Sequence, residues 1–215
     1  MKDLIIIGAG GFGREAVWVA ERINERTPEW NMLGFLDDSE AMQAQEVGGY
    51  PVLGKLTAAA AYPDAYYLCA IGSSRVRERI VSRMQEILPK AKYAVLIDPT
   101  VQMSKRVQIG EGTIVCAGSI LTVDIVVGSH VLINLDCTVG HDSVISDFVT
   151  LFPSVNVSGM TQLGRCAELG TGTQMIPQKT IGAGAVIGAG SVVIKDIPEN
   201  CTAVGSPCKP IKYFD

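Results

Sequence analysis

The segment IGAGAVIGAGSVV, residues 181–193, carries one six-residue pattern twice. In each copy an aliphatic residue is followed by glycine and alanine, and a small residue stands four places after the aliphatic one. Working outward, the aliphatic position recurs at every sixth residue without a skip, at Ile97, Met103, Ile109, Val115, Leu121, Val127, Ile133, Val139, Ile145, Leu151, Val157, Leu163, Leu169, Met175, Ile181, Ile187 and Val193. Self-similarity at a fixed period is typical of repeat architectures, so this pattern decides the fold of the second half of the chain.

Each repeat predicts a short strand and a turn. A small residue and the next aliphatic residue, such as Ala185 and Ile187, are two places apart and therefore point to the same, inward side of a strand. Glycines occupy two fixed turn positions, namely Gly110, Gly128, Gly140, Gly164, Gly170, Gly182 and Gly188 directly after the aliphatic residue, and Gly112, Gly118, Gly172, Gly184 and Gly190 two places later. We expect both positions to need backbone angles that only glycine adopts without strain.

Composition narrows the function classes. Lys and Arg number 18 and Asp and Glu 22, giving a formal charge of −4. A protein that binds nucleic acid or an anionic membrane would need an excess of positive charge instead. No apolar run approaches the ~18 residues of a membrane-spanning helix, and the apolar residues at 4–7 predict a buried strand rather than an export signal. The six cysteines are irregularly spaced with no CxxC pair, so we expect reduced thiols in a cytoplasmic protein and no metal site.

Residues 1–95 follow another pattern, with strands alternating with helices. We expect strands at 3–7, 32–36 and 66–71, a helix from the glycine-rich segment after residue 7 to about residue 24, and a helix after Gly72 and Ser73 to about residue 88. Such alternation predicts a parallel sheet with right-handed crossovers. The chain therefore divides into a small Rossmann-like α/β domain over 1–95 and an all-β domain with a C-terminal tail over 96–215.

A glycine motif opens the first helix. Gly8, Gly10, Gly11 and Gly13 have the spacing that lets a backbone approach a phosphate at a helix N-terminus. Asp37 and Asp38 follow the second expected strand, where an acid can bind a ribose hydroxyl. An NAD-dependent enzyme is one interpretation, but ~95 residues build only about half of a dinucleotide-binding sheet, so a single nucleotide is the better fit.

The six-residue pattern resembles the left-handed parallel β-helix of hexapeptide acyltransferases, in which three strands make one triangular coil of eighteen residues. The whole chain resembles the sugar acyltransferase family that includes the sialic acid O-acetyltransferases and the bacterial UDP-4-amino-sugar N-acetyltransferases. The resemblance is carried by the stretches 8–14, 36–38, 70–74, 134–159 and 204–209. It implies a homotrimer that uses acetyl-CoA, with active sites between adjacent β-helices and a nucleotide-linked sugar held by the N-terminal domain.

His141 and Gly159 can also be interpreted from their positions in this fold. His141 falls two places after the inward Val139, which places it on an outer corner of the triangle. Gly159 comes eighteen residues later and so lies on the same corner one coil along, ~4.8 Å away. An imidazole can take a proton from an attacking amine or hydroxyl, and a preorganised N–H can stabilise the oxyanion of acyl transfer.

The resemblance assigns roles to matched residues. It implies that His141 is the base, that Asp142 orients it, that the Gly159 amide faces the thioester oxygen, and that Asn134 belongs to the same site. It implies substrate contacts for Gly8, Gly10, Gly11, Gly13, Asp37, Asp38, Gly72 and Ser73. Contacts with acetyl-CoA are implied for Gly159, Gly205, Pro207 and Lys209. We expect no catalytic role for His130, the other histidine.

This chain also departs from the pattern. Some amino-sugar N-acetyltransferases of the family carry a second histidine where Thr150 stands and a histidine in the glycine loop where Phe12 stands. The sequence therefore favours acetyl transfer to the amine of a nucleotide-linked sugar and leaves open O-acetylation of a sugar hydroxyl, as in sialic acid. An interpretation from another class is a noncatalytic β-helix that senses a nucleotide sugar or serves as a scaffold, against which the corner pair His141 and Asp142 argues.

Overall fold

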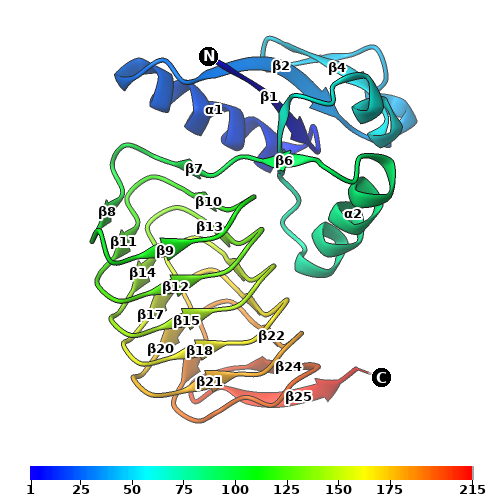
Figure 1. Ribbon diagram of the computed structural model, residues 1–215. Coiled ribbons are helices and arrows are strands. Elements are labelled where there is room, and N and C mark those ends of the chain that lie inside the picture. The colour runs from blue at the N-terminus through cyan, green and yellow to red at the C-terminus, as the bar shows by residue number, and fades with distance from the viewer. Residues whose placement is uncertain (215) are drawn as a thin grey trace.

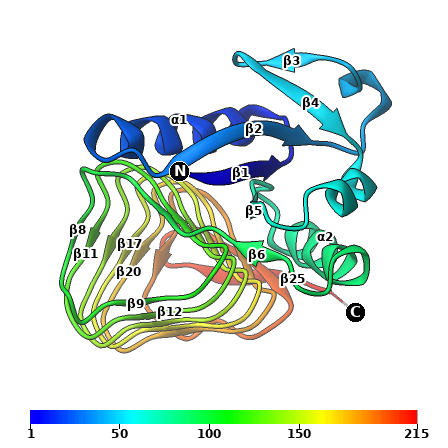
Figure 2. The same ribbon diagram turned by 45° about the horizontal axis from the view of Figure 1, so that its top comes forward.

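The computed structural model describes residues 1–214 and divides as the sequence predicted into an α/β domain and a stack of triangular coils. The α/β domain lies across the first coils of the stack, and the C-terminus lies at the opposite end (Figure 1). Viewed closer to the stack axis, the coils superimpose as a triangle with helix α1, Gly11–Arg26, along one side (Figure 2). The described residues contain no helix long and apolar enough to cross a membrane.

The N-terminal domain is one six-stranded sheet in the order β3-β4-β2-β1-β5-β6. Its strands are β1 Lys2–Ile7, β2 Trp30–Leu36, β3 Glu46–Val47, β4 Tyr50–Gly54, β5 Tyr66–Cys69 and β6 Lys92–Tyr93. Its helices are α1, α2 Ser74–Ile87 and the short 3₁₀ turns η1 Glu40–Met42 and η2 Leu56–Ala61. All pairings are parallel except β3 with β4, so the βαβ prediction is confirmed. Buried aliphatic residues on β1 pack against α1 on one side of the sheet and α2 on the other.

The coils form a left-handed parallel β-helix with three faces. The first face contains β7 Leu96–Ile97, β10 Ile114–Val115, β13 Leu132–Ile133, β16 Thr150–Leu151, β19 Glu168–Leu169, β22 Val186–Ile187, β24 Cys201–Val204 and the antiparallel β25 Lys209–Tyr213. The second contains β8 Gln102–Met103, β11 Ile120–Leu121, β14 Thr138–Val139, β17 Asn156–Val157, β20 Gln174–Met175 and β23 Val192–Val193. The third contains β9 Gln108–Ile109, β12 Val126–Val127, β15 Val144–Ile145, β18 Gln162–Leu163 and β21 Thr180–Ile181.

Three columns of turns join these faces. We call the turns from the first to the second face the Asn134 corner, those from the second to the third the His141 corner, and those from the third back to the first the α2 corner. Residues eighteen apart pair in register, as Leu132 does with Thr150, so each coil repeats the geometry of the one before it. Adjacent coils are therefore one strand spacing apart, about 4.8 Å.

The core of the β-helix is the predicted aliphatic column together with the small residues beside it. Every aliphatic position from Val115 to Val193 is at most 3% exposed, and small polar members such as Thr113 and Ser119 are fully buried. Their hydroxyls donate to backbone carbonyls, so no polar atom there lacks a partner. The inward prediction was wrong for Met103, which is 41% exposed because it belongs to the first coil and has no coil above it.

The two glycine positions have different causes, which corrects the sequence-based explanation. From residue 112 to residue 190, every turn has one residue with positive φ, and nine of these residues are not glycine, Asp142 at 58° among them. The glycines directly after the aliphatic residue have no positive φ. They are needed because the next coil passes too close, and a Cβ on Gly164 would lie 2.5 Å from the backbone nitrogen of Ala183.

The N-terminal domain covers only one face of the β-helix. Ile114 and Leu132, which point outward from the first face, are 0% and 2% exposed because they share a hydrophobic cluster with α1. Ile120 on the second face is 38% exposed, and Val126 and Val144 on the third are each 42% exposed. Outward apolar residues are thus covered on the first face and open on the two faces that meet at the His141 corner.

Candidate functional site

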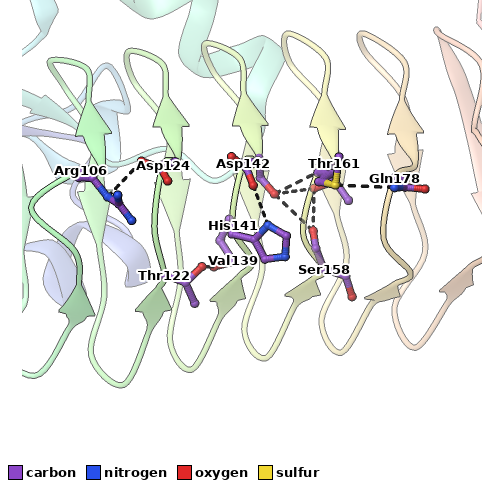
Figure 3. Close-up of polar contacts among 11 residues, drawn as sticks. Arg106, Thr122, Asp124, Val139, His141, Asp142, Ser158, Thr161 and Gln178 are labelled. Carbon is purple, nitrogen blue, oxygen red and sulfur yellow. Dashed lines mark hydrogen bonds and ion pairs between the residues drawn. The ribbon is translucent and has the colours of Figure 1, made fainter.

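His141 lies where the sequence placed it, on an outer corner directly after β14 (Figure 3). Its Nδ1 is 2.7 Å from Oδ2 of Asp142, and both side chains are 57% exposed. Asp142 can turn back toward its neighbour because its backbone is left-handed, a conformation that Asp tolerates better than most residues. With Nδ1–H donated to the carboxylate, Nε2 carries the free lone pair, which is the state a general base requires.

Gly159 lies directly below the imidazole, as the eighteen-residue spacing predicted. A Cβ on Gly159 would lie 2.6 Å from Nε2 of His141, so only glycine fits beneath the ring in this position. The ring covers Gly159, which is buried. The backbone N–H groups on either side are used, since that of Ser158 donates to the Met175 carbonyl and that of Met160 donates to the backbone carbonyl of His141. The Gly159 N–H donates to no group within residues 1–214. A lone pair and a free backbone donor are thus stacked at one corner.

Asn134 does not reach His141 within one chain. It follows β13 and lies on the Asn134 corner, at the other edge of the second face, where its Oδ1 accepts a hydrogen bond of 2.7 Å from the Leu135 N–H. Its neighbour Leu135 packs in the same hydrophobic cluster as Phe12 of the glycine loop. Asn134 is therefore close to the chain's own N-terminal domain and separated from the chain's own His141.

The glycine loop has the predicted form. Gly8 adopts a φ of 102°, and a side chain on Gly13 would collide with the Gly8 carbonyl, so these two glycines allow the tight approach of helix to strand. Gly10 and Gly11 border open space, since an added Cβ would meet nothing within 4 Å. They line a cavity of about 500 Å³ together with Arg14 and Asp37. Arg14 was not predicted as a site residue, although a basic residue directly after the glycine motif is a usable signal.

Both acids after β2 are engaged by the protein. Asp37 accepts the Ala9 N–H at 2.9 Å, which ties it to the glycine loop, and Asp38 accepts the Leu56 N–H at 2.9 Å and pairs with Arg83. The Leu56 N–H is the main reason that the pKa of Asp38 is lowered from its usual value. The two carboxylates line a second, mostly apolar cavity of about 150 Å³ at the carboxyl ends of β1 and β2. A ribose or base would meet carboxylates that are already oriented.

Gly72 and Ser73 follow β5 at the same edge of the sheet, and Ser73 is exposed. The N-terminus of α2 that they open is occupied, because the Ser74 N–H donates to the carboxylate of Glu168 at 2.6 Å. Arg77, one turn into α2, is fully buried against the β-helix and was missed as an interdomain residue. Helical spacing could have found it, since Ser74, Arg77, Val81 and Met84 form the buried stripe of α2.

Gly205, Pro207 and Lys209 lie at the far end of the Asn134 corner. Gly205 and Pro207 belong to the turn between β24 and β25, and Lys209 is the first residue of β25. The turn is held to the last coil by the hydrogen bond that the Gly205 N–H donates to Ser191 Oγ at 3.1 Å. Like Asn134, they are on the opposite edge of the second face from the chain's own His141. The chain therefore has the predicted residues at three places: the His141 corner, the Asn134 corner with its C-terminal turn, and the N-terminal domain.

His130 is buried rather than a surface residue. It is 5% exposed, stacks on Phe148 with ring centroids 5.1 Å apart and meets the edge of Tyr93. Burial, followed by the charge of Arg77, lowers its pKa to about 4. Its Nδ1 has no hydrogen-bond partner among the described residues. Within residues 1–214, no three His, Cys, Asp or Glu side chains are grouped so as to hold a metal ion.

Comparison with known proteins extends over the whole chain. The model of the PglD N-terminal domain matches residues 3–84. The acetyltransferase domain of PglB from Neisseria gonorrhoeae, solved with acetyl coenzyme A, is 32% identical with a TM-score of 0.87, over 98% of this chain and 99% of that one. A variant of perosamine N-acetyltransferase from Caulobacter crescentus, solved with CoA and GDP-perosamine, is 28% identical with a TM-score of 0.88, over 98% and 97%.

Matches to curated sequences are shorter. A Staphylococcus aureus protein that is provisionally named an acetyltransferase is 47% identical over 58 residues, which is 27% of this chain and 29% of that protein. A Schizosaccharomyces pombe protein named in the same way is 57% identical over 47 residues, or 22% and 23%. The chain thus matches about a quarter of the length of these relatives. The full-length likeness to the PglB domain, together with the fold and the corner motif, shows that this chain belongs to the hexapeptide-repeat sugar acetyltransferases.

Proposed function

We propose that this protein transfers the acetyl group of acetyl-CoA to the amine of a nucleotide-linked amino sugar. The observation that carries the proposal is the stack of His141, Asp142 and Gly159 on one outer corner, with a carboxylate on Nδ1 and an unused backbone N–H beneath the ring. The PglB domain was solved with acetyl coenzyme A and the perosamine enzyme with GDP-perosamine, which supports both substrates.

The reaction follows from the chemistry of these groups. The amine nitrogen attacks the thioester carbonyl carbon while Nε2 of His141 takes the amine proton, and Asp142 stabilises the imidazolium that forms. The Gly159 N–H stabilises the negative charge on the thioester oxygen. When the tetrahedral intermediate collapses, the C–S bond breaks, and the thiolate of CoA takes the proton back from the imidazolium. The amide and free CoA leave, and no other reactant is needed.

We propose that the site is shared between copies in a trimer. Within one chain, Asn134 and His141 lie at opposite edges of the second face, so in the proposed assembly a second copy supplies His141 to the substrate held by the first. The open apolar residues Ile120, Val126 and Val144 flank the His141 corner and support a subunit contact there. The free thiols of all six cysteines support a cytoplasmic setting.

The nucleotide-linked part of the acceptor fits the N-terminal domain. Arg14, Gly10 and Gly11 line one cavity at the start of α1, where a helix N-terminus and a guanidinium favour a diphosphate. The apolar cavity beside Asp37 and Asp38 suits the nucleoside. Because one relative was solved with a GDP-linked sugar, GDP- and UDP-linked acceptors are both tested.

The test measures release of free CoA thiol from acetyl-CoA with UDP-, GDP- and CMP-linked amino and hydroxy sugars. We expect turnover with an amino sugar and a loss of ~10²–10⁴ in kcat for His141→Ala, the usual contribution of a general base. Glu111→Ala is the control and should retain wild-type turnover. Glu111 occupies the same position within its turn as His141 does, but its turn lies on the α2 corner. Wild-type turnover in His141→Ala refutes the mechanism, and turnover only with hydroxy sugars assigns O-acetylation.

A further inference from the structure

Arg77 joins the two domains through a set of hydrogen bonds that contains no carboxylate. Within the N-terminal domain it donates to the carbonyls of Ile71 and Gly72. Across the interface its acceptors are three carbonyls and one hydroxyl, namely His130 O at 2.9 Å, Phe148 O at 2.7 Å, Val149 O at 3.2 Å and Thr150 Oγ1 at 3.0 Å. Its side chain is fully buried, so the guanidinium is solvated only by groups that the docked domains provide.

Thr150 completes the connection at the segment Gly72–Ser73, which we call the substrate loop. Thr150 Oγ1 accepts from Arg77 and donates to the Gly72 carbonyl at 2.8 Å, so one hydroxyl holds both the arginine and the loop. It is 2% exposed. The next residue, Ser74, is held by Glu168 and by the Cys166 carbonyl. The substrate loop therefore has a fixed position on the β-helix.

Along the axis of the β-helix, this connection lies at a height between those of His141 and Gly159. Thr150 follows His141 by nine residues and precedes Gly159 by nine, which is half of the eighteen-residue coil in each direction. With coils ~4.8 Å apart, Thr150 lies ~2.4 Å along the axis from each of them, midway between base and backbone donor. In a trimer whose axis runs parallel to the β-helix, rotation preserves height, and the same relation would then hold for His141 and Gly159 of a neighbouring copy.

We propose that Arg77 and Thr150 are positioning residues that fix the substrate loop at the axial level of the His141–Gly159 pair and so deliver the acceptor amine to Nε2. This inference rests on the proposed function. Neither residue touches the reacting atoms, and both act through Gly72. In acyl transfer a displacement of about 1 Å can cost ~10²-fold in rate, which is the scale of effect that a loosened loop produces.

The experiment compares Thr150→Val and Thr150→Ala, which both remove the hydroxyl, with Thr150→Ser, which keeps it. Thr202→Val is the matched control, since Thr202 lies on the same face and no side-chain hydrogen bond of its own is found among the described residues. We measure kcat with the preferred nucleotide-linked amino sugar, the KM for acetyl-CoA, and the Kd of the corresponding free nucleotide by calorimetry.

We expect kcat to fall ~10- to 100-fold in both hydroxyl-deleted variants and to return in Thr150→Ser. The nucleotide Kd should stay within about twofold, because the cavities are lined by N-terminal residues alone, and the effect should therefore appear in kcat. Wild-type kcat in either deleted variant overturns the inference, as does a rise in nucleotide Kd parallel to the loss of kcat. A wild-type protein that acetylates no acceptor overturns the proposed function and, with it, this inference.

Discussion

The two histidines of the chain show how burial separates the roles of one residue type. His141 is exposed beside a carboxylate on an outer corner, whereas His130 is enclosed by Phe148 and Tyr93 between the domains. Each stands in a turn of the six-residue repeat. The count of residues per coil placed His141 on the same corner as Gly159, whereas the burial of His130 depends on the packing of the N-terminal domain.

Substitution of Gly159 by alanine should lower activity without unfolding the protein. The added methyl would lie 2.6 Å from His141 Nε2, and because the imidazole is exposed it can rotate away, which moves the base rather than the backbone. We expect kcat to fall at least ~10-fold, with a change in Tm of under about 2 °C. Gly164→Ala is the contrast, since its methyl meets the backbone of Ala183. Equal losses of Tm in the two variants would contradict this explanation.

Acid should weaken the protein through His130. The pKa of this histidine falls from 6.5 to about 4 on folding, chiefly because burial disfavours the charged ring, so the unfolded state binds the extra proton between these values. Above pH 6.5 the ring is neutral in both the folded and the unfolded state, so it adds no pH dependence. As the pH falls toward 4, the free energy of unfolding decreases by about 3 kcal/mol. Urea unfolding at pH 7, 5.5 and 4.5 measures it. His130→Phe should flatten this dependence, because it removes the titrating ring. Phenylalanine should be tolerated there, since Phe148 has similar positive φ one coil on. An unchanged slope in that variant would exclude His130 as the cause.

At the scale of the element, each turn of the β-helix solves two problems with different residues. One position needs a left-handed backbone and accepts Asp, His, Phe or Gln as well as glycine, at a cost of about 1 kcal/mol for a residue with a side chain. The other needs the absence of a side chain because the next coil is too close. The sequence displays both as glycine, which is why one explanation was extended wrongly to both.

Gln178→Gly should therefore stabilise the protein. Gln178 is exposed with a φ of 62°, and glycine adopts this angle at no steric cost, so we expect the free energy of unfolding to rise by about 0.5–1 kcal/mol. Gln174→Gly is the matched control on the adjoining strand β20, where glycine should lower stability by a similar amount. Urea unfolding compares them, and a destabilised Gln178→Gly would show that its side-chain contact with Met160 outweighs the backbone strain.

At the scale of the whole molecule, the separation of Asn134 from His141 leads to a test of the shared site. His141→Ala and Asn134→Ala should each be nearly inactive alone. After unfolding and refolding as an equal mixture, about one interface in four combines the two intact residues, so about a quarter of wild-type activity should return. The kinetic assay is paired with light scattering to establish the size of the assembly. A mixture as inactive as its components, or a monomer that is active, would exclude a site shared between copies.

Much of the fold could be predicted because repeats record their geometry locally. The step of six from Ile97 to Val193 gave the strands, the coil of eighteen and the stacking of His141 on Gly159, since period-two alternation and strand spacing depend on backbone geometry alone. The spacing of Gly8, Gly10 and Gly13 similarly reflects one tight turn. Exposure of Met103 could not be predicted, because it depends on which coil comes first in the stack.

The sequence by itself determined the two-domain architecture, the corner that carries His141 and Asp142, and the glycine loop, because each depends on residues close along the chain or one period apart. Only the tertiary structure decided that Arg77 and Thr150 join the domains at Gly72, that His130 is buried, and that Asn134 is remote from its own His141. These depend on how helix α2 docks against a β-helix far away in sequence. Burial and long-range hydrogen bonds set that docking, and neither has a period.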